Sequence, residues 1–272
     1  MPFSFQIYLE AQQAGVINQF TGRGVHGFWF QRWQKVDPST GDSLHNSNTV
    51  QPFTLSPLMG LPGMQGGVIQ IRKGWRAQFR LTLLDEALGE VIISKWLPGL
   101  PGQVLSLPPS IDGDARLNWK VTHVEETARI SYEELSRKYL ISSVPPRQWT
   151  LDFLTPTTFH GKETHLPFPL PKSLAQTWLR RWNLFAPMAL PEEVTEWAHT
   201  KLAVSSFHLQ TLPAREADRL RVGCVGRITL RAIDTPPYLR AALDVLAHYA
   251  EFCGSGSHTT QGLGQTKLIK CS

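Results

Sequence analysis

The sequence contains few cysteines and none in a paired arrangement. Cys224, Cys253 and Cys271 are the three in 272 residues, and no two of them form a CxxC pair. An odd number without close pairs disfavours both a disulfide framework and a zinc ribbon. We therefore expect reduced thiols and a cytoplasmic protein.

Long apolar runs and metal-binding motifs are also missing. No stretch of about 18 apolar residues occurs, which disfavours a membrane-spanning helix. The opening residues, MPFSFQIYLEAQQ, lack a basic stretch followed by an apolar core, so we expect no signal peptide. No carboxylate pair, His-x-x-Glu-His pattern or aspartate-rich cluster marks a metal site. We expect neither a metal ion nor another cofactor.

The composition that remains is that of a folded protein with a slight basic excess. Hydrophobic residues make up 42% and charged residues 18%, which is enough apolar material for a core. The formal net charge is +5 and the pI is about 9.2. A charge this small is compatible with a nucleic-acid partner but does not establish one.

The hydrophobic pattern predicts two mixed sets of strands and helices that meet near residue 125. Residues 3–9 alternate as a half-buried strand does, and residues 236–253 have helical spacing after two prolines. EVIIS (90–94) is predicted to be a strand, and DSLHNSNTV (42–50) a turn-rich piece. Each half is compatible with a β-α-β-β-α-β unit.

Four glycines lie close together near the C-terminus, at positions 254, 256, 262 and 264. Glycine permits positive φ angles and close backbone approach, so such a loop can offer successive N–H groups to phosphate oxygens. No Gly-Lys-Ser/Thr follows, which excludes a P-loop, and the loop follows a helix, which excludes a dinucleotide fingerprint. A simple flexible turn remains an equal alternative from spacing alone.

The run YAEFCGSGSHTTQGLGQTK (249–267) resembles the C-terminal signature of the RAMP superfamily of CRISPR proteins. More narrowly, the chain resembles the stand-alone endoribonucleases that process CRISPR repeat RNA. Three further segments agree in the right order: GVHGFWFQRW followed by DSLHNSNTVQPFTLSPL, then LDFLTPTTF, then VGCVGRITLRA. Together these matches span nearly the whole chain.

This resemblance implies an α+β protein with two tandem ferredoxin-like, RRM-type domains, which we place at residues 1–125 and 126–272. It also implies a metal-independent reaction on repeat RNA, in which the ribose 2′-OH attacks the adjacent phosphate. The products would be a 2′,3′-cyclic phosphate and a 5′-OH, and the outcome mature crRNA. Partners would be repeat RNA and a CRISPR effector complex, with the protein a monomer or a homodimer.

Two histidines match family positions at which a histidine acts, His26 and His45. The reaction needs a base for the 2′-proton and an acid for the leaving 5′-oxygen, and imidazole suits both because its pKa of about 6.5 lies near neutrality. Which histidine takes which role stays open. An arbitrary histidine is more often a surface or hydrogen-bonded residue, and we interpret most of the other seven in that way.

The sequence departs from the family pattern at the third, charge-stabilising position. Some members carry a lysine a few residues after the active-site histidine, but residues 49–52 here are Thr-Val-Gln-Pro. Arg23, Arg32 and Lys35 are near in sequence and could supply the positive charge. Each could equally be a general phosphate contact or a solvated side chain.

RNA contacts are predicted in two regions. Arg72, Lys73 and Arg76 interleave with Trp75 and Phe79, and cations beside aromatics suit RNA. An amphipathic element with buried aromatics is an equal alternative there, and the favoured reading of WLRRW (178–182). In the C-terminal loop the predicted RNA-binding residues are Gly254, Gly256, His258, Gly262, Gly264, Gln265 and Lys267.

Two rival functions remain. The first is a non-catalytic crRNA-binding subunit of a CRISPR effector complex, which the missing lysine leaves open. The second is an unrelated RRM-type RNA binder, which would show no preference for repeat RNA. The paired N-terminal histidines favour the enzyme.

Overall fold

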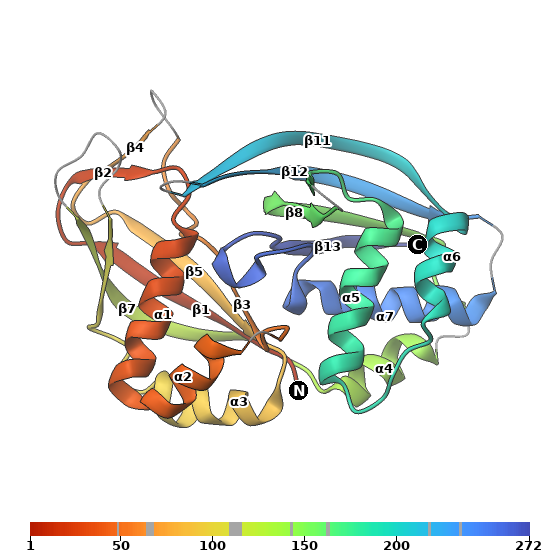
Figure 1. The fold of residues 1–272 in the computed structure, drawn as a ribbon, viewed down its shortest axis with the longest axis horizontal. Coiled ribbons are helices and arrows are strands. Elements are labelled where there is room, and N and C mark those ends of the chain that lie inside the picture. Colours follow the sequence, from red (N-terminus) through yellow and green to blue (C-terminus); the bar gives the residue numbers. More distant parts are fainter. Residues whose placement is uncertain are drawn as a thin grey trace.

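The computed structural model describes residues 1–47, 49–63, 68–108, 116–141, 144–161, 164–216, 219–233 and 236–272, and for residues 215, 216 and 219 the backbone alone. Two antiparallel sheets form two lobes that lie side by side (Figure 1). No helix among the described residues is long and apolar enough to cross a membrane.

The N-terminal sheet has five strands. Their order across the sheet is β3 (Phe53–Leu55), β5 (Arg76–Leu83), β1 (Phe3–Ala11), β7 (Leu117–Arg129) and β6 (Val104–Leu107). The alternation predicted for β1 is confirmed, because Phe3, Phe5, Ile7 and Leu9 are each at most 2% exposed. A separate hairpin pairs β2 (Gly15–Asn18) with β4 (Val68–Ile71).

Two helices follow one another closely in this lobe. Helix α1 (Gly22–Val36) buries Trp29 and Trp33 in the core. Asp37 ends α1 and starts α2 (Pro38–Asn46), because its carboxylate accepts a hydrogen bond from the Thr40 N–H and Pro38 occupies the first helical turn. The segment predicted to be turn-rich is therefore helical as far as Asn46, and His45 lies on a helix.

The strand predicted at residues 90–94 is also wrong. This stretch lies in α3 (Glu86–Val91) and a following π-helical turn, η1 (Ile92–Trp96). The Asp85 carboxylate caps α3 by accepting from the Leu88 N–H at 2.8 Å. Gly89 lets this helix approach the sheet, because a Cβ there would clash with the Phe3 ring. Capping and tertiary packing thus override the β propensity of Val91, Ile92 and Ile93.

The C-terminal sheet has four strands. Their order is β11 (Leu202–Glu216), β12 (Arg219–Ala232), β8 (Gln148–Thr157) and β13 (Thr266–Cys271). Gly226 has φ of +115° and lies at a break in the β8–β12 register, as at a β-bulge. The remaining elements are α4 (Tyr132–Leu140), β9 (Phe159–His160), β10 (His165–Leu166), α5 (Pro171–Phe185), α6 (Glu193–Lys201), α7 (Pro237–Cys253) and the 3₁₀ turn η2 (Thr259–Gln261).

Both lobes share one topology. In each, the four principal strands, numbered in chain order, are arranged 2-3-1-4, with a helix after the first and another after the third. This is the β-α-β-β-α-β ferredoxin-like arrangement, so the predicted fold class is confirmed. The boundary predicted at residue 125 falls inside β7, which stays paired with β1 as far as Arg129. Residues 126–129 therefore belong to the first sheet.

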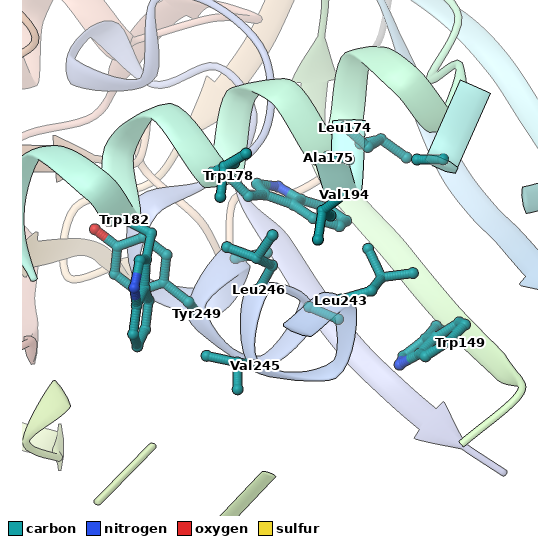
Figure 2. Packing of buried hydrophobic residues seen from close by; sticks show 14 of the residues in the cluster. Trp149, Leu174, Ala175, Trp178, Trp182, Val194, Leu243, Val245, Leu246 and Tyr249 are labelled. Carbon is teal, nitrogen blue, oxygen red and sulfur yellow. The ribbon is translucent and has the colours of Figure 1, made fainter. Parts of the chain in front are cut away.

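Helix α7 is the centre of the C-terminal core. It is buried around nearly its whole circumference, because β8 and β13 lie on one side and α4 and α5 on others. Figure 2 shows Trp178 and Trp182 of α5 packed over Leu246 and Tyr249 of α7. The aromatics of WLRRW are thus core residues, as the amphipathic reading predicted.

The lobes meet where α7 ends. The last carbonyls of a helix have no partner within it, and here the N-terminal lobe supplies donors. The Thr82 hydroxyl donates to the Phe252 carbonyl at 2.6 Å, and the half-buried Arg80 guanidinium donates to the Glu251 carbonyl at 2.7 Å. Tyr132 donates in return to the Leu84 carbonyl at 2.7 Å. These contacts fix the two lobes relative to each other.

Candidate active site and interdomain cleft

The two predicted catalytic histidines meet across one aromatic ring. His26 and Phe30 are four residues apart on α1 and share a face of the helix. Their ring centroids are 4.9 Å apart. The His45 ring, which α2 carries, contacts the same Phe30 ring, with 5.2 Å between the two centroids. Both contacts are edge-to-face. The turn at Asp37-Pro38 therefore folds α2 back against α1, which brings both imidazoles into contact with the Phe30 ring.

His26 is the more enclosed of the two. Its pKa is lowered to about 4, chiefly by burial and in addition by the nearby charges of His45 and Arg23. His26 is therefore neutral at pH 7 and able to accept a proton. His45 is exposed to solvent.

The three nearby cations differ in position. Arg23 is exposed and close enough to His26 for its charge to affect that ring. Lys35 is exposed near the end of α1. Arg32 points elsewhere, because its guanidinium donates to the Trp96 carbonyl at 3.2 Å and to the Pro98 carbonyl at 2.5 Å. Arg32 therefore ties α1 to the turn after η1, and we do not include it in the proposed site.

The C-terminal glycine loop joins the two lobes. Gly254, Gly256, Gly262 and Gly264 all have positive φ, as only glycine readily allows. At Gly262 an added Cβ would lie 3.0 Å from the Gly22 Cα and 3.1 Å from the Pro57 nitrogen. A Cβ at Gly22 would in turn clash with the Gln261 carbonyl oxygen. The glycines thus allow backbone-to-backbone packing between the loop and α1.

Many amides of this loop already have internal acceptors. The N–H groups of Ser255, Ser257, Leu263 and Gly264 donate to the carbonyls of Gly264, Thr158, His258 and Pro156. The expected row of amides facing a phosphate therefore does not form along most of the loop. Gln265 is 3% exposed, and its amide donates to the Leu55 carbonyl at 3.3 Å, so its side chain belongs to the contact between lobes. Lys267 is exposed on β13.

A cleft of about 480 Å³ lies between the lobes. One wall is the segment after α2, and the others are α5, the end of β8–β9 and the glycine loop. Its lining residues are Thr49, Val50, Gln51, Phe159, His160, Ser173, Gln176, Thr177, Arg180, Arg181, Gly256, Ser257, His258, Thr259 and Thr260. The cleft thus begins beside the histidine-bearing helix α2 and reaches two arginines of α5.

The two α5 arginines have separate surroundings. Arg181 donates to the Gly254 carbonyl at 3.2 Å, to the Gly256 carbonyl at 3.0 Å and to the Thr259 hydroxyl at 3.2 Å, so it holds the loop in shape. Arg180 is exposed at the cleft. The motif WLRRW marks both arginines in the sequence. Their different surroundings depend on the fold of the glycine loop, which lies more than 70 residues away along the chain.

A second group of histidines lies at the cleft, where His160 and His258 are among the lining residues. His160 and His165 face each other across the β9–β10 hairpin with ring centroids 5.0 Å apart, and each is 5.8 Å from the His258 ring. His258 has φ of +57°, an uncommon left-handed conformation for a residue with a Cβ. The short spacing of His160 and His165 in the sequence is a signal for this group, although both belong to the histidines that the sequence analysis interprets as surface or hydrogen-bonded residues.

The predicted basic cluster near residue 75 is only partly exposed. Arg72, Lys73 and Arg76 lie on the surface of the turn between β4 and β5. Phe79 is 1% exposed, and the Trp75 indole donates to the Gly60 carbonyl at 2.9 Å. Phe79 and Trp75 both pack against the N-terminal core, as the amphipathic alternative predicted. The cation–ring contacts of the described residues do not involve Arg72, Lys73 or Arg76. Gly66 and Gly67 of the neighbouring glycine-rich loop lie outside the described residues.

The fold and the site thus place the chain in the class of tandem ferredoxin-like proteins with a cleft between the lobes. The comparison with protein families agrees with this class and narrows it. The model "CRISPR Cas6 N-terminal domain" matches residues 1–111, and the model "CRISPR-associated endoribonuclease Cas6" matches residues 151–266. The chain belongs to the Cas6 family of CRISPR-associated endoribonucleases.

Solved structures support this assignment over the whole chain. A Cas6 (TTHB231) product complex is 25% identical, with a TM-score of 0.76 and coverage of 99% of this chain and 100% of that one. A Cas6 (TTHA0078) product complex is 25% identical, with a TM-score of 0.74 and coverage of 99% of both chains. Thermus thermophilus Cas6 (TTHB231) is 23% identical, with a TM-score of 0.70 and coverage of 99% and 98%. No curated protein matches the sequence.

Proposed function

We propose that this protein cleaves CRISPR repeat RNA by attack of a ribose 2′-OH on the adjacent phosphate, with His26 and His45 carrying the proton transfers. The observation that carries the proposal is the meeting of both imidazoles at Phe30, from two consecutive helices. A base and an acid are then available on one surface, and each is typically worth about 10²–10⁴-fold in rate. Similarity to Cas6 structures solved as product complexes and as a substrate-mimic complex supports an RNA substrate.

The surroundings of the histidines suggest how the roles are divided. His26 is neutral at pH 7 because burial lowers its pKa to about 4, so we assign it the base role toward the 2′-proton. This leaves His45 as the acid that protonates the leaving 5′-oxygen. Arg23 is the candidate for stabilising the charge on the phosphate, since its own charge already acts on His26.

The cleft provides a path for the RNA next to this pair. Thr49, Val50 and Gln51 follow directly after α2 and line one wall, while Arg180 and His258 line another. A strand whose scissile phosphate lies at the histidines could place neighbouring phosphates against these groups. Arg72, Lys73 and Arg76 would contact a more distant part of the repeat through its phosphates, because Phe79 is buried and the Trp75 indole is hydrogen-bonded to the Gly60 carbonyl. Lys35 and Lys267, both exposed, remain candidates for such phosphate contacts.

The test is single-turnover cleavage of candidate CRISPR repeat RNAs in buffer containing EDTA. We expect one cut per repeat with 2′,3′-cyclic phosphate and 5′-OH ends, because the nucleophile belongs to the RNA. A single 2′-deoxy nucleotide at the cut should abolish the reaction, whereas the same change one nucleotide away should not. Tight binding of the all-ribose repeat without any cutting would instead identify a crRNA-binding subunit.

A further inference from the structure

Helix α7 and strand β13 bring together three potential metal ligands that are far from the proposed active site in the sequence. Asp244 and His248 are four residues apart on α7 and share one face of the helix. Cys271 pairs with Trp149 in the β8–β13 ladder, so both side chains stand on the same face of the sheet. One ligand atom from each of Asp244, His248 and Cys271 lies within 4.8 Å of the other two.

The separations are close to those of a tetrahedral site. Zinc bonds of about 2.0–2.3 Å at tetrahedral angles place ligand atoms about 3.3–3.8 Å apart. The His248 Nε2 atom already lies 3.8 Å from the Asp244 Oδ1 atom. Small side-chain rotations would close the remaining distance to the Cys271 sulfur.

Among the described residues, this cluster has no lysine or arginine partner for its carboxylate and no hydrogen-bond partner for the His248 Nε2 atom. Asp244 is 3% exposed and is not neutralised by a lysine or arginine among the described ion pairs. The His248 Nε2 atom is buried and has no hydrogen-bond partner among the described residues. Burial raises the pKa of Asp244 to about 6 and lowers that of His248 to about 4, so the two do not form a stable ion pair at neutral pH. Lys138 lies near enough to His248 to affect its pKa.

Two of the three side chains are also held in orientation. The Trp149 indole N–H donates to the Asp244 Oδ1 atom at 2.9 Å, and Figure 2 shows Trp149 beside α7. The His248 ring stacks on Tyr139, with centroids 3.8 Å apart and an interplanar angle of 11°. Outer contacts of this kind are typical of metal ligands, because they fix the carboxylate and imidazole before the ion arrives.

We infer that Asp244, His248 and Cys271 form a binding site for a zinc-like divalent transition-metal ion. One thiolate, one imidazole and one carboxylate suit zinc or cobalt rather than magnesium or calcium, which prefer oxygen ligands. Cys271 is exposed, which gives the ion a path of entry and leaves a fourth position for water. The ion would tie the last strand to α7. The sequence had predicted no metal site, because these residues form no local motif.

The experiment uses tag-free full-length protein, stripped with chelator and kept reduced, and titrated with Co²⁺. We expect one equivalent to produce the visible bands of tetrahedral cobalt and a thiolate-to-cobalt charge-transfer band, both removed by Zn²⁺. Cys271→Ser should abolish the charge-transfer band. Asp244→Asn, which retains an oxygen acceptor for Trp149, should weaken Co²⁺ binding at least tenfold.

Two controls distinguish this site from other histidines. His199→Ala, an exposed change on α6, and His160→Ala, at the cleft, should both retain the cobalt spectrum. Absence of tetrahedral bands in the wild type, or persistence of the charge-transfer band in Cys271→Ser, would overturn the inference. Loss of the cobalt spectrum in His160→Ala would also overturn it. None of these readouts involves RNA, so the outcome is independent of the proposed cleavage reaction.

Discussion

The first helices of the two ferredoxin-like units occupy equivalent places but carry different chemistry. Helix α1 presents His26 and leads into the helix that carries His45, whereas α5 presents Arg180 and Arg181. The glycine loop lies between them, packed against Gly22 of α1 and hydrogen-bonded by Arg181 of α5. In the proposed reaction the two copies of one fold therefore divide the work, with proton transfer assigned to α1 and α2 and phosphate contact to α5, and the loop contacts both α1 and α5.

The second helices differ as well. The N-terminal unit has the short α3 followed by a π-helical turn, whereas the C-terminal unit has the fully packed α7. The terminal carbonyls of α7 are bound by Thr82 and Arg80 of the other lobe. The C-terminal unit thus contributes a fully packed helix whose end is hydrogen-bonded to the unit that carries the two histidines.

The largest expected difference between the lobes concerns the reaction rate. The single variants His45→Ala and His26→Ala should each slow single-turnover cleavage by about 10²-fold or more, because each loses one proton transfer. RNA affinity should remain near normal. His199→Ala, an exposed histidine of the C-terminal lobe, is the matched control and should cleave at the wild-type rate. Unchanged rates in both active-site variants would remove the site assignment.

A pair of glycines on α1 tests the attachment of the loop. Gly22→Ala should lower the free energy of unfolding by about 3 kcal/mol, because its Cβ would clash with the Gln261 carbonyl in a packed region. Gly27→Ala lies on the same helix with nothing within 4 Å of its Cβ, and should instead stabilise by about 0.5–1 kcal/mol. Chemical denaturation of both variants measures the contrast, and equal effects would contradict the packing role of Gly22.

The α5 arginines offer a corresponding contrast in the other lobe. Arg181→Met should lower the free energy of unfolding by about 2 kcal/mol, because the Gly254 and Gly256 carbonyls lose a charged donor. Arg180→Met should change stability by no more than about 0.5 kcal/mol, since that side chain is exposed. Its effect should appear in RNA binding, with a salt slope smaller by about 1. Identical behaviour of the two variants would argue against the separation of roles.

The alternation predicted for β1 is retained in the core, because a strand's period is a local property of its sequence. The capping box of Ser131 and Glu134 at the start of α4 is a local signal of the same kind, although the sequence analysis did not use it. The family resemblance located His26 and His45, although the helix that carries His45 was missed because Asp37 both ends one helix and caps the next. A cap of this kind is visible in the sequence once the helix before it is known.

Long-range assembly determined what the sequence did not reveal. Arg32 and Gln265 appeared suited to RNA, but tertiary contacts direct them to carbonyls of η1, the turn after it and β3. Cys271 reaches His248 only because β13 pairs with β8 beneath α7. No spacing rule connects these positions, since the register of the sheet brings them together.

The smallest expected effect concerns the pH dependence of stability. The folded pKa of His26, about 4, lies below its ordinary value of 6.5, so the unfolded chain binds the proton more readily. Stability from this residue is complete above pH 6.5 and is lost progressively as the pH falls toward 4, by about 1 kcal/mol between pH 7 and 5.5. His26→Gln should remove that part of the slope, which we would measure by urea denaturation at both pH values. Because Asp244 and His248 titrate equally in both proteins, the difference between wild type and variant isolates His26, and an identical slope would show that this ring is not held neutral by burial on α1.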